Sequence, residues 1–137
     1  MKNKKTERGQ SLVELAISLV ILLYLLGGAV EFGMAFFQFV QLRDAVQEGA
    51  LYGSMNPDDT SGITARVRGS SGSPIDLSTL TPTFAYSSSN HCEGEGITVT
   101  LTYDHKIFMP FIPQILNTDT IPLTASVTDT ILSPVCP

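Results

Sequence analysis

The chain has 137 residues, a net charge of −5 and 15% charged side chains, enough for one small domain attached to a long apolar element. Its basic residues are segregated, because Lys2, Lys4, Lys5 and Arg8 are half of the 8 present. The remainder is acidic and contains no basic patch, so we expect no nucleic-acid partner.

The first predicted element is an apolar helix that begins directly after these basic residues. No charge lies between Glu14 and Glu31, and a helix over residues 12–40 would extend about 43 Å, beyond the roughly 30 Å hydrocarbon core of a bilayer. Because the basic residues lie only on its N-terminal side, the positive-inside rule places the N-terminus in the cytoplasm and the C-terminal part outside. A cleaved signal peptide is the alternative, since residues 27–29 are small, but the helical pattern continues to about Tyr52.

Beyond Glu31 the apolar residues take on a helical period, which predicts that the same helix becomes amphipathic. Gln38 and most of the other polar residues fall off this stripe. The side chains along this stripe become smaller toward its C-terminal end, from Phe to Gly, so another element could approach closely at Gly49 and Gly53. We therefore expect a domain to pack on residues 42–53. The stripe consists of Phe32, Ala35, Phe39, Leu42, Val46, Gly49 and Gly53.

The rest of the chain is rich in Thr, Ser, Gly and Pro and predicts a small β-rich domain. Stop signals at 53–57 end the long helix, and a short helix follows over 58–69 with Ile63 and Val67 on one face. A Ser/Gly loop at 69–74 separates it from the strands.

Three strands are predicted, a weak one at 82–87 and two alternating ones at 97–103 and 120–131. Pro122 points to an edge or a strand start. An antiparallel sheet of this size is not stable alone, so it would lie on the amphipathic part of the long helix. The predicted fold class is α+β.

The connection between the last two strands, residues 107–116, is unusually apolar for a loop. Phe108, Met109, Phe111 and Ile112 lie there with two prolines. We interpret this segment as part of the core; a subunit contact and an adhesion patch are the alternatives.

The sequence offers little for catalysis or metal binding. His91, Cys92, Glu93 and Glu95 gather in one run, but no second ligand pair has zinc-like spacing and His105 is isolated. The run NPDDTSG lacks the ligand ladder of a calcium loop, and no nucleophile–base order stands out. We therefore expect no catalytic residue, no metal, no cofactor and no enzymatic activity.

Residues 9–54 resemble the TadE-like pilins of the Tad (Flp) pilus. The matching pieces are GQSLVE, GGAVEFG and AVQEGALYG, and the later runs GITVTLTYD and TIPLTASVTDT resemble more loosely the strands that close such domains. RGQSLVE is similar to a prepilin processing site, with Gly9 before the cut. The resemblance implies a type IV pilin-like fold with a leader at 1–9, the long helix at 10–54 and an exported domain at 55–137.

The resemblance also implies a structural role. The chain would be an inner-membrane precursor, cut by a prepilin peptidase between Gly9 and Gln10 and polymerised into a helical surface filament for adhesion. The implied partners are copies of itself or other pilins, the peptidase, the membrane assembly platform and, before assembly, membrane lipid. The alternatives are a single-pass membrane-anchored binding module outside the cytoplasm that does not polymerise and, more weakly, an anchored exported enzyme.

Glu14 would be the fifth residue of the processed chain, one helical turn or about 6 Å from the new amine of Gln10. It could neutralise that ammonium, or a neighbour's, inside a helix bundle, where either charge alone would cost several kcal/mol. An unpaired glutamate at the membrane edge is the alternative.

Two further features of the helix have open roles. Gly27 and Gly28 each weaken a helix by roughly 1 kcal/mol relative to Ala, and they could mark a bend or unwinding during assembly or a close helix–helix contact. Glu31 has no basic residue near it before Arg43, and we favour an interfacial position for it over a packing role.

Both cysteines, Cys92 and Cys136, lie in the part predicted to be outside the cytoplasm, where disulfides persist. Cys92 precedes one alternating strand and Cys136 follows the other. If these strands are antiparallel neighbours, both thiols reach one end of the sheet, which predicts a disulfide that closes about 45 residues and contributes roughly 4 kcal/mol. A bridge between subunits and two free thiols are the alternatives.

Overall fold

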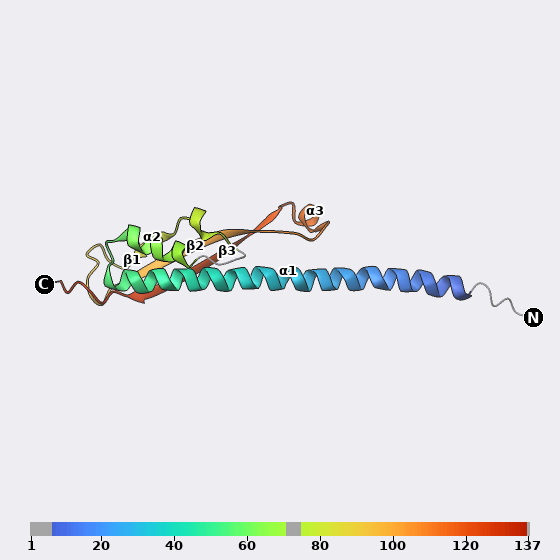
Figure 1. Cartoon of the computed structure of the whole chain (residues 1–137), viewed down its shortest axis with the longest axis horizontal. Coiled ribbons are helices and arrows are strands. Elements are labelled where there is room, and N and C mark those ends of the chain that lie inside the picture. Colours follow the sequence, from blue (N-terminus) through green and yellow to red (C-terminus); the bar gives the residue numbers. More distant parts are fainter. Residues whose placement is uncertain (1–6, 71–74, 137) are drawn as a thin grey trace, which may run out of the picture.

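The computed structural model describes residues 7–70 and 75–136, a long helix with a small domain on its C-terminal half (Figure 1). Helix α1 (Glu7–Met55) is continuous, and the domain contains helices and an antiparallel sheet. The α+β class and the packing of sheet on helix are confirmed. The predictions that rest on Lys2, Lys4, Lys5 and the Arg8 side chain, and on most of the Ser/Gly loop, lie outside the described residues.

Helix α2 (Thr60–Gly69) lies against the end of α1 and is started by Asp59. The Asp59 carboxylate accepts the Ser61 hydroxyl at 2.6 Å, the Gly62 N–H at 2.9 Å and the Tyr52 hydroxyl at 2.9 Å. These hydrogen bonds, the one from Ser61 foremost, lower the pKa of the Asp59 carboxyl. The predicted inner face of this helix is correct, since Ile63 and Val67 are fully buried.

The sheet has the strand order β1 (Thr83–Tyr86), β2 (Gly96–Lys106), β3 (Thr120–Thr130), antiparallel throughout. Its inner face buries Ile97, Val99 and Leu101 of the central strand. Its outer face carries a ladder of hydroxyl pairs between β2 and β3, 2.7–3.0 Å apart. β3 is an edge strand, in agreement with Pro122. A short 3₁₀ turn (Leu77–Thr79) ahead of β1 was not predicted.

The hairpin of β2 and β3 runs back along α1 toward its N-terminal half (Figure 1). Ile97 at the start of β2 contacts the Gly53 position, and His105 near its end reaches Gln38. The strand between them extends about 26 Å. The short helix α3 (Ile112–Leu116) lies at the far end of this hairpin.

The face of α1 that packs on the domain differs from the predicted stripe at its N-terminal end. Phe32 is 72% exposed, whereas Gln38, which was placed off the stripe, is buried. The reason is that the hairpin meets this level of α1 through Glu31 and Gln38, which leaves Phe32 on the surface, where its ring stacks on Phe36 of the same helix. The full burial of the helix begins at Leu42 and includes Ala45, Val46 and Ala50.

The expected close approach at the two glycines is confirmed. A Cβ at Gly49 would overlap the Val67 side chain of α2, and a Cβ at Gly53 would lie 2.7 Å from the Ile97 Cδ1 of β2. Because only glycine leaves room for these contacts, α2 and β2 both reach the surface of α1 at this point.

We expect Gly49→Ala to lower the free energy of unfolding by about 1–3 kcal/mol, because the new methyl group overpacks the contact with Val67. Denaturant unfolding of the full chain in detergent micelles measures the change. Gly33→Ala is the matched control: no described atom lies within 4 Å of its added Cβ, so it should keep stability or raise it by up to about 1 kcal/mol. Equal stability of the two variants would contradict the close packing of α2 on α1.

Candidate functional site

The N-terminal half of α1 is an apolar surface that the rest of the described chain leaves uncovered except on one side near Tyr24 and Gly27. Leu12, Leu19 and Leu25 are each more than half exposed. Within the described residues α1 is the one helix whose length and composition suit a membrane span, and its most apolar stretch has no buried residue. The core helix of a water-soluble domain would be covered by its own chain, so this exposed apolar helix favours a membrane anchor.

The predicted processing residues lie at the start of this uncovered half. Gly9, Gln10 and Glu14 are all exposed on α1, and the last two are one turn apart, about 6 Å along the axis. No described atom lies within 4 Å of the position that a Cβ would take at Gly9. The ion pairs formed among residues 9–70 and 75–136 do not include Glu14.

Glu31 is bonded to the hairpin at the point where the uncovered half of α1 ends. Its Oε1 lies 3.0 Å from His105 Nε2, and its carboxylate oxygens accept the Phe108 N–H at 3.0 and 3.2 Å. His105 is 1% exposed, and its Nδ1 lies 2.6 Å from Gln38 Oε1. The Glu31 carboxylate accepts a hydrogen bond from His105 Nε2, and Gln38 bonds the other ring nitrogen, so both polar ends of the buried ring have a partner on α1.

This cluster corrects two interpretations made from the sequence. Glu31 has a basic partner and holds the hairpin on the helix, and His105 is not isolated, because the two pair across 74 positions of the chain. Two signals pointed to the cluster. His105 is the next inward position after Tyr103 in the alternation of β2, and Gln38 follows Glu31 by two helical turns on the same face.

The segment 107–116, which we call the hairpin tip, is mostly not core. Ile107 is buried, but Phe108 and Phe111 are 65% and 62% exposed. The prediction of a core segment is therefore wrong beyond its first residue. The physical reason is that the tip extends past the end of the domain and has only α1 beneath it (Figure 1).

Gly27 and Gly28 lie beneath this tip. A Cβ at Gly27 would lie 3.4 Å from the Met109 Cε, and the rings of Tyr24 and Phe111 have centroids 6.4 Å apart. The two glycines thus leave room for the hairpin tip of the same chain, whereas the sequence predicts a second helix as one possible neighbour. α1 is continuous through both glycines, and their unwinding during assembly stays a prediction.

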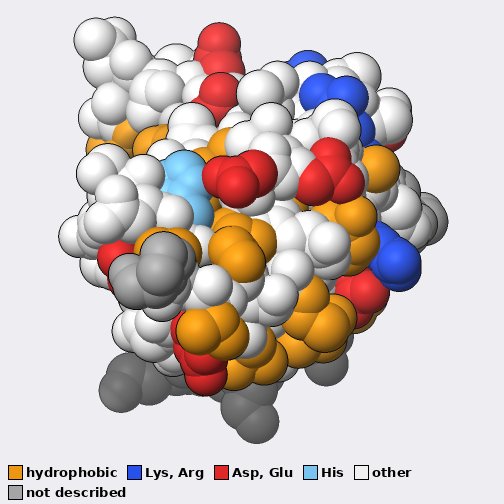
Figure 2. Space-filling view, turned by 90° about the vertical axis from the view of Figure 1, so that its left-hand side faces the viewer, with side chains coloured by type: hydrophobic (Ala, Val, Ile, Leu, Met, Phe, Trp, Pro, Cys, Tyr) orange, Lys and Arg blue, Asp and Glu red, His pale blue; other side chains and the backbone are white. Residues whose placement is uncertain are grey.

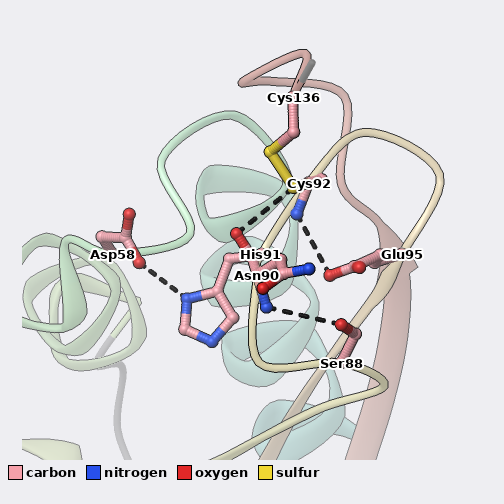
Figure 3. Close-up of a disulfide and its surroundings, with 7 residues drawn as sticks. All are labelled: Asp58, Ser88, Asn90, His91, Cys92, Glu95 and Cys136. Atoms are coloured by element: carbon pink, nitrogen blue, oxygen red, sulfur yellow. Dashed lines mark hydrogen bonds and ion pairs between the residues drawn. A yellow bond between two sulfur atoms is a disulfide. The ribbon is translucent and has the colours of Figure 1, made fainter.

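The opposite end of the domain carries acidic, basic, histidine, hydrophobic and uncharged side chains, and neither sign of charge gathers into one large patch (Figure 2). Cys92 and Cys136 form a disulfide there, with Cα atoms 5.5 Å apart (Figure 3). Gly96 pairs with Thr130, so the start of β2 and the end of β3 meet as expected. The bridge contributes roughly 4 kcal/mol in the chain-entropy model.

Backbone hydrogen bonds also hold the C-terminal tail at this end. The Glu93 N–H donates to the Pro134 carbonyl and the Gly94 N–H to the Ile131 carbonyl, both at 2.9 Å. The tail is therefore fixed by the turn before β2 as well as by the disulfide.

The titratable side chains beside the disulfide point in different directions (Figure 3). His91 Nδ1 lies 2.6 Å from the Asp58 carboxylate, while the Glu95 carboxylate accepts the Cys92 N–H at 3.1 Å. No group of three such residues in the described part of the chain could hold a metal ion. These side chains shape the turn that presents Cys92 to Cys136.

We expect Glu31→Ala to loosen the hairpin on α1 by about 1–3 kcal/mol, because the Phe108 N–H and the buried His105 ring lose their acceptor. Amide hydrogen exchange at Phe108, measured in the full chain in detergent micelles, should accelerate roughly tenfold to a hundredfold.

Glu48→Ala is the control for this measurement, since Glu48 lies on α1 like Glu31 but its carboxylate forms an exposed ion pair, 3.9 Å from Arg66 of α2. Exchange at Phe108 should not change in that variant. If exchange is equally slow in Glu31→Ala, the carboxylate does not hold the hairpin.

The similarity of this chain to known proteins lies in α1. A family model described as TadE-like protein matches residues 9–51, which span the predicted processing site, the uncovered half of α1, Glu31 and most of the packed half. Neither the curated proteins nor the solved structures that were searched contain a match. The resemblance read from the sequence is confirmed over this helix. Through it the chain is similar to the TadE-like family, and that similarity associates it with the Tad pilus.

Proposed function

We propose that this chain is a structural pilin subunit of a Tad-type surface filament. It is made as an inner-membrane precursor, cut between Gly9 and Gln10 by a prepilin peptidase, and polymerised through α1. The observation that carries the proposal is the uncovered N-terminal half of α1, which from residue 9 onward lies within the segment, residues 9–51, that matches the TadE-like family.

The uncovered half of α1 suits two successive environments. Lipid covers its apolar side chains in the precursor, and the same half of neighbouring subunits covers them in the filament. Extraction from lipid costs little if each side chain exchanges one apolar neighbour for another. The packed half keeps the domain at a fixed level of the helix in both states, because its core residues from Leu42 to Gly53 contact only the domain.

Glu14 favours the move of α1 from lipid into the filament, because its carboxylate finds a partner only there. A carboxylate within the apolar surface is costly in lipid and in a bundle unless it is paired. Cleavage after Gly9 would create an ammonium group on Gln10, and pairing of this group with Glu14 of a neighbouring subunit would fix the axial register of the filament. A membrane-anchored binding module that never polymerises would use the same helix without needing this carboxylate.

We expect Glu14→Ala to be inserted and cleaved normally but to form few surface filaments. Loss of a pairing worth several kcal/mol should reduce filament yield by roughly a hundredfold or more. Immunoblots of membranes report the precursor and its processing, and sheared surface material reports the filaments.

Glu48→Ala, which removes an exposed carboxylate from the packed half of the same helix, is the matched control and should form filaments at the normal yield. Normal filaments from Glu14→Ala would contradict the role of this carboxylate in assembly. A block in cleavage in that variant would shift its role to recognition by the peptidase.

A further inference from the structure

The hairpin tip lies beside the part of α1 that is suited to a membrane. Met109 contacts Gly27 and Gly28, and Phe111 lies against Tyr24, although the domain itself packs no further than Glu31. Tyr24 is seven residues before Glu31, which is about 10 Å along the helix axis. The tip therefore extends to a level that the uncovered, charge-free half of α1 occupies.

The level of Glu31 matches the edge of a bilayer. The run between Glu14 and Glu31 contains no charged residue, and its length of about 26 Å is close to the roughly 30 Å hydrocarbon thickness. With Glu31 at the outer edge of the hydrocarbon, the tip reaches about 10 Å into the outer leaflet.

The composition of the hairpin tip suits this depth. It contains no charged residue and one polar side chain, Gln114. Phe108, Phe111 and Ile115 are exposed, Ile115 at 75%. Lys106 and Asp119 flank the tip where the strands enter and leave it, and the Ile107 N–H donates to the Asp119 carbonyl at 3.0 Å. Charges are thus placed at the headgroup level and excluded from the tip.

The tip is held at this level by the cluster at the membrane edge. Glu31 accepts the Phe108 N–H and pairs with His105, so the base of the tip is bonded to the helix that spans the membrane. An apolar groove between α1 and the tip, lined by Val20, Leu23 and Met109 among others, is open to the surroundings of the helix. The groove has a volume of about 230 Å³ and an apolar lining, which suits an acyl chain.

We propose that the hairpin tip is a second membrane contact, which enters the outer leaflet of the phospholipid bilayer beside α1. The inference rests on the membrane position of α1 in the proposed function and is independent of polymerisation. Lipid is favoured over a neighbouring subunit because the exposed apolar surface of the tip joins that of α1 at Tyr24 and Gly27. Any bilayer around the helix at that level therefore also surrounds the tip.

The absence of tryptophan from the chain permits a direct test. The full chain carrying Phe111→Trp is reconstituted at low density in phosphatidylcholine–phosphatidylglycerol vesicles with acyl chains brominated near the headgroup. Leu19→Trp reports the membrane span, and Leu132→Trp, exposed at the opposite end of the domain, reports the aqueous part. Ile115→Trp repeats the measurement at a second exposed tip position.

We expect bromine to quench Phe111→Trp and Ile115→Trp several times more than Leu132→Trp. Quenching of Leu19→Trp without quenching at either tip position would overturn the proposal and leave α1 as an anchor. Absence of quenching at Leu19→Trp as well would overturn the membrane position of α1 and this inference with it. The measurement is repeated at higher protein-to-lipid ratios with the same lipids. Tip quenching that is present at low density and falls at higher density confirms lipid contact in the dispersed chain. Tip positions that are not quenched at any density indicate contact with a second copy and contradict the proposal.

Discussion

The packing of the domain on the small-residue face of α1 is the constraint on which the rest of the structure depends. Gly49 and Gly53 let α2 and β2 reach the helix surface, and the core forms around that contact. A three-stranded sheet has no independent stability, so this face of α1 completes the fold. Because the glycines lie near the C-terminal end of a helix of 49 residues, the core of the domain covers only that half, and most of the apolar surface of the other half stays exposed.

The cluster of Glu31, His105 and Gln38 marks the boundary between the two halves. It replaces apolar packing by a buried, hydrogen-bonded pair at the level where the helix changes its surroundings. A buried pair contributes less to net stability than apolar contacts do, but it accepts few alternative partners and so fixes the level of the hairpin on the helix. Because α1 is one continuous helix, this contact also fixes the position of the domain relative to the N-terminal half of the helix.

Periodicity alone predicted the long helix, the inner face of α2 through Ile63 and Val67, the two long strands and the close approach at Gly49. Each of these follows from local residue spacing. The local spacing placed His105 on the inner face of β2 and Gln38 on the face of Glu31, but it did not bring these elements together, and it did not indicate that the hairpin tip is exposed. Both depend on how far β2 runs along α1. The alternation of β2 extends three residues beyond the predicted strand end at Tyr103, and that extension carries His105 to the helix and the apolar loop past the domain. The loop was read as core because its composition is that of a core.

The mass of the chain in purified surface filaments tests the central claim most directly. Sheared filaments are separated from membranes, and the intact mass and the N-terminal peptide of this chain are determined by mass spectrometry. The account predicts that the chain is an integral component whose first residue is Gln10, so that residues 1–9 are missing. Filaments that lack the chain, or that contain it with residues 1–9 attached, would contradict the account.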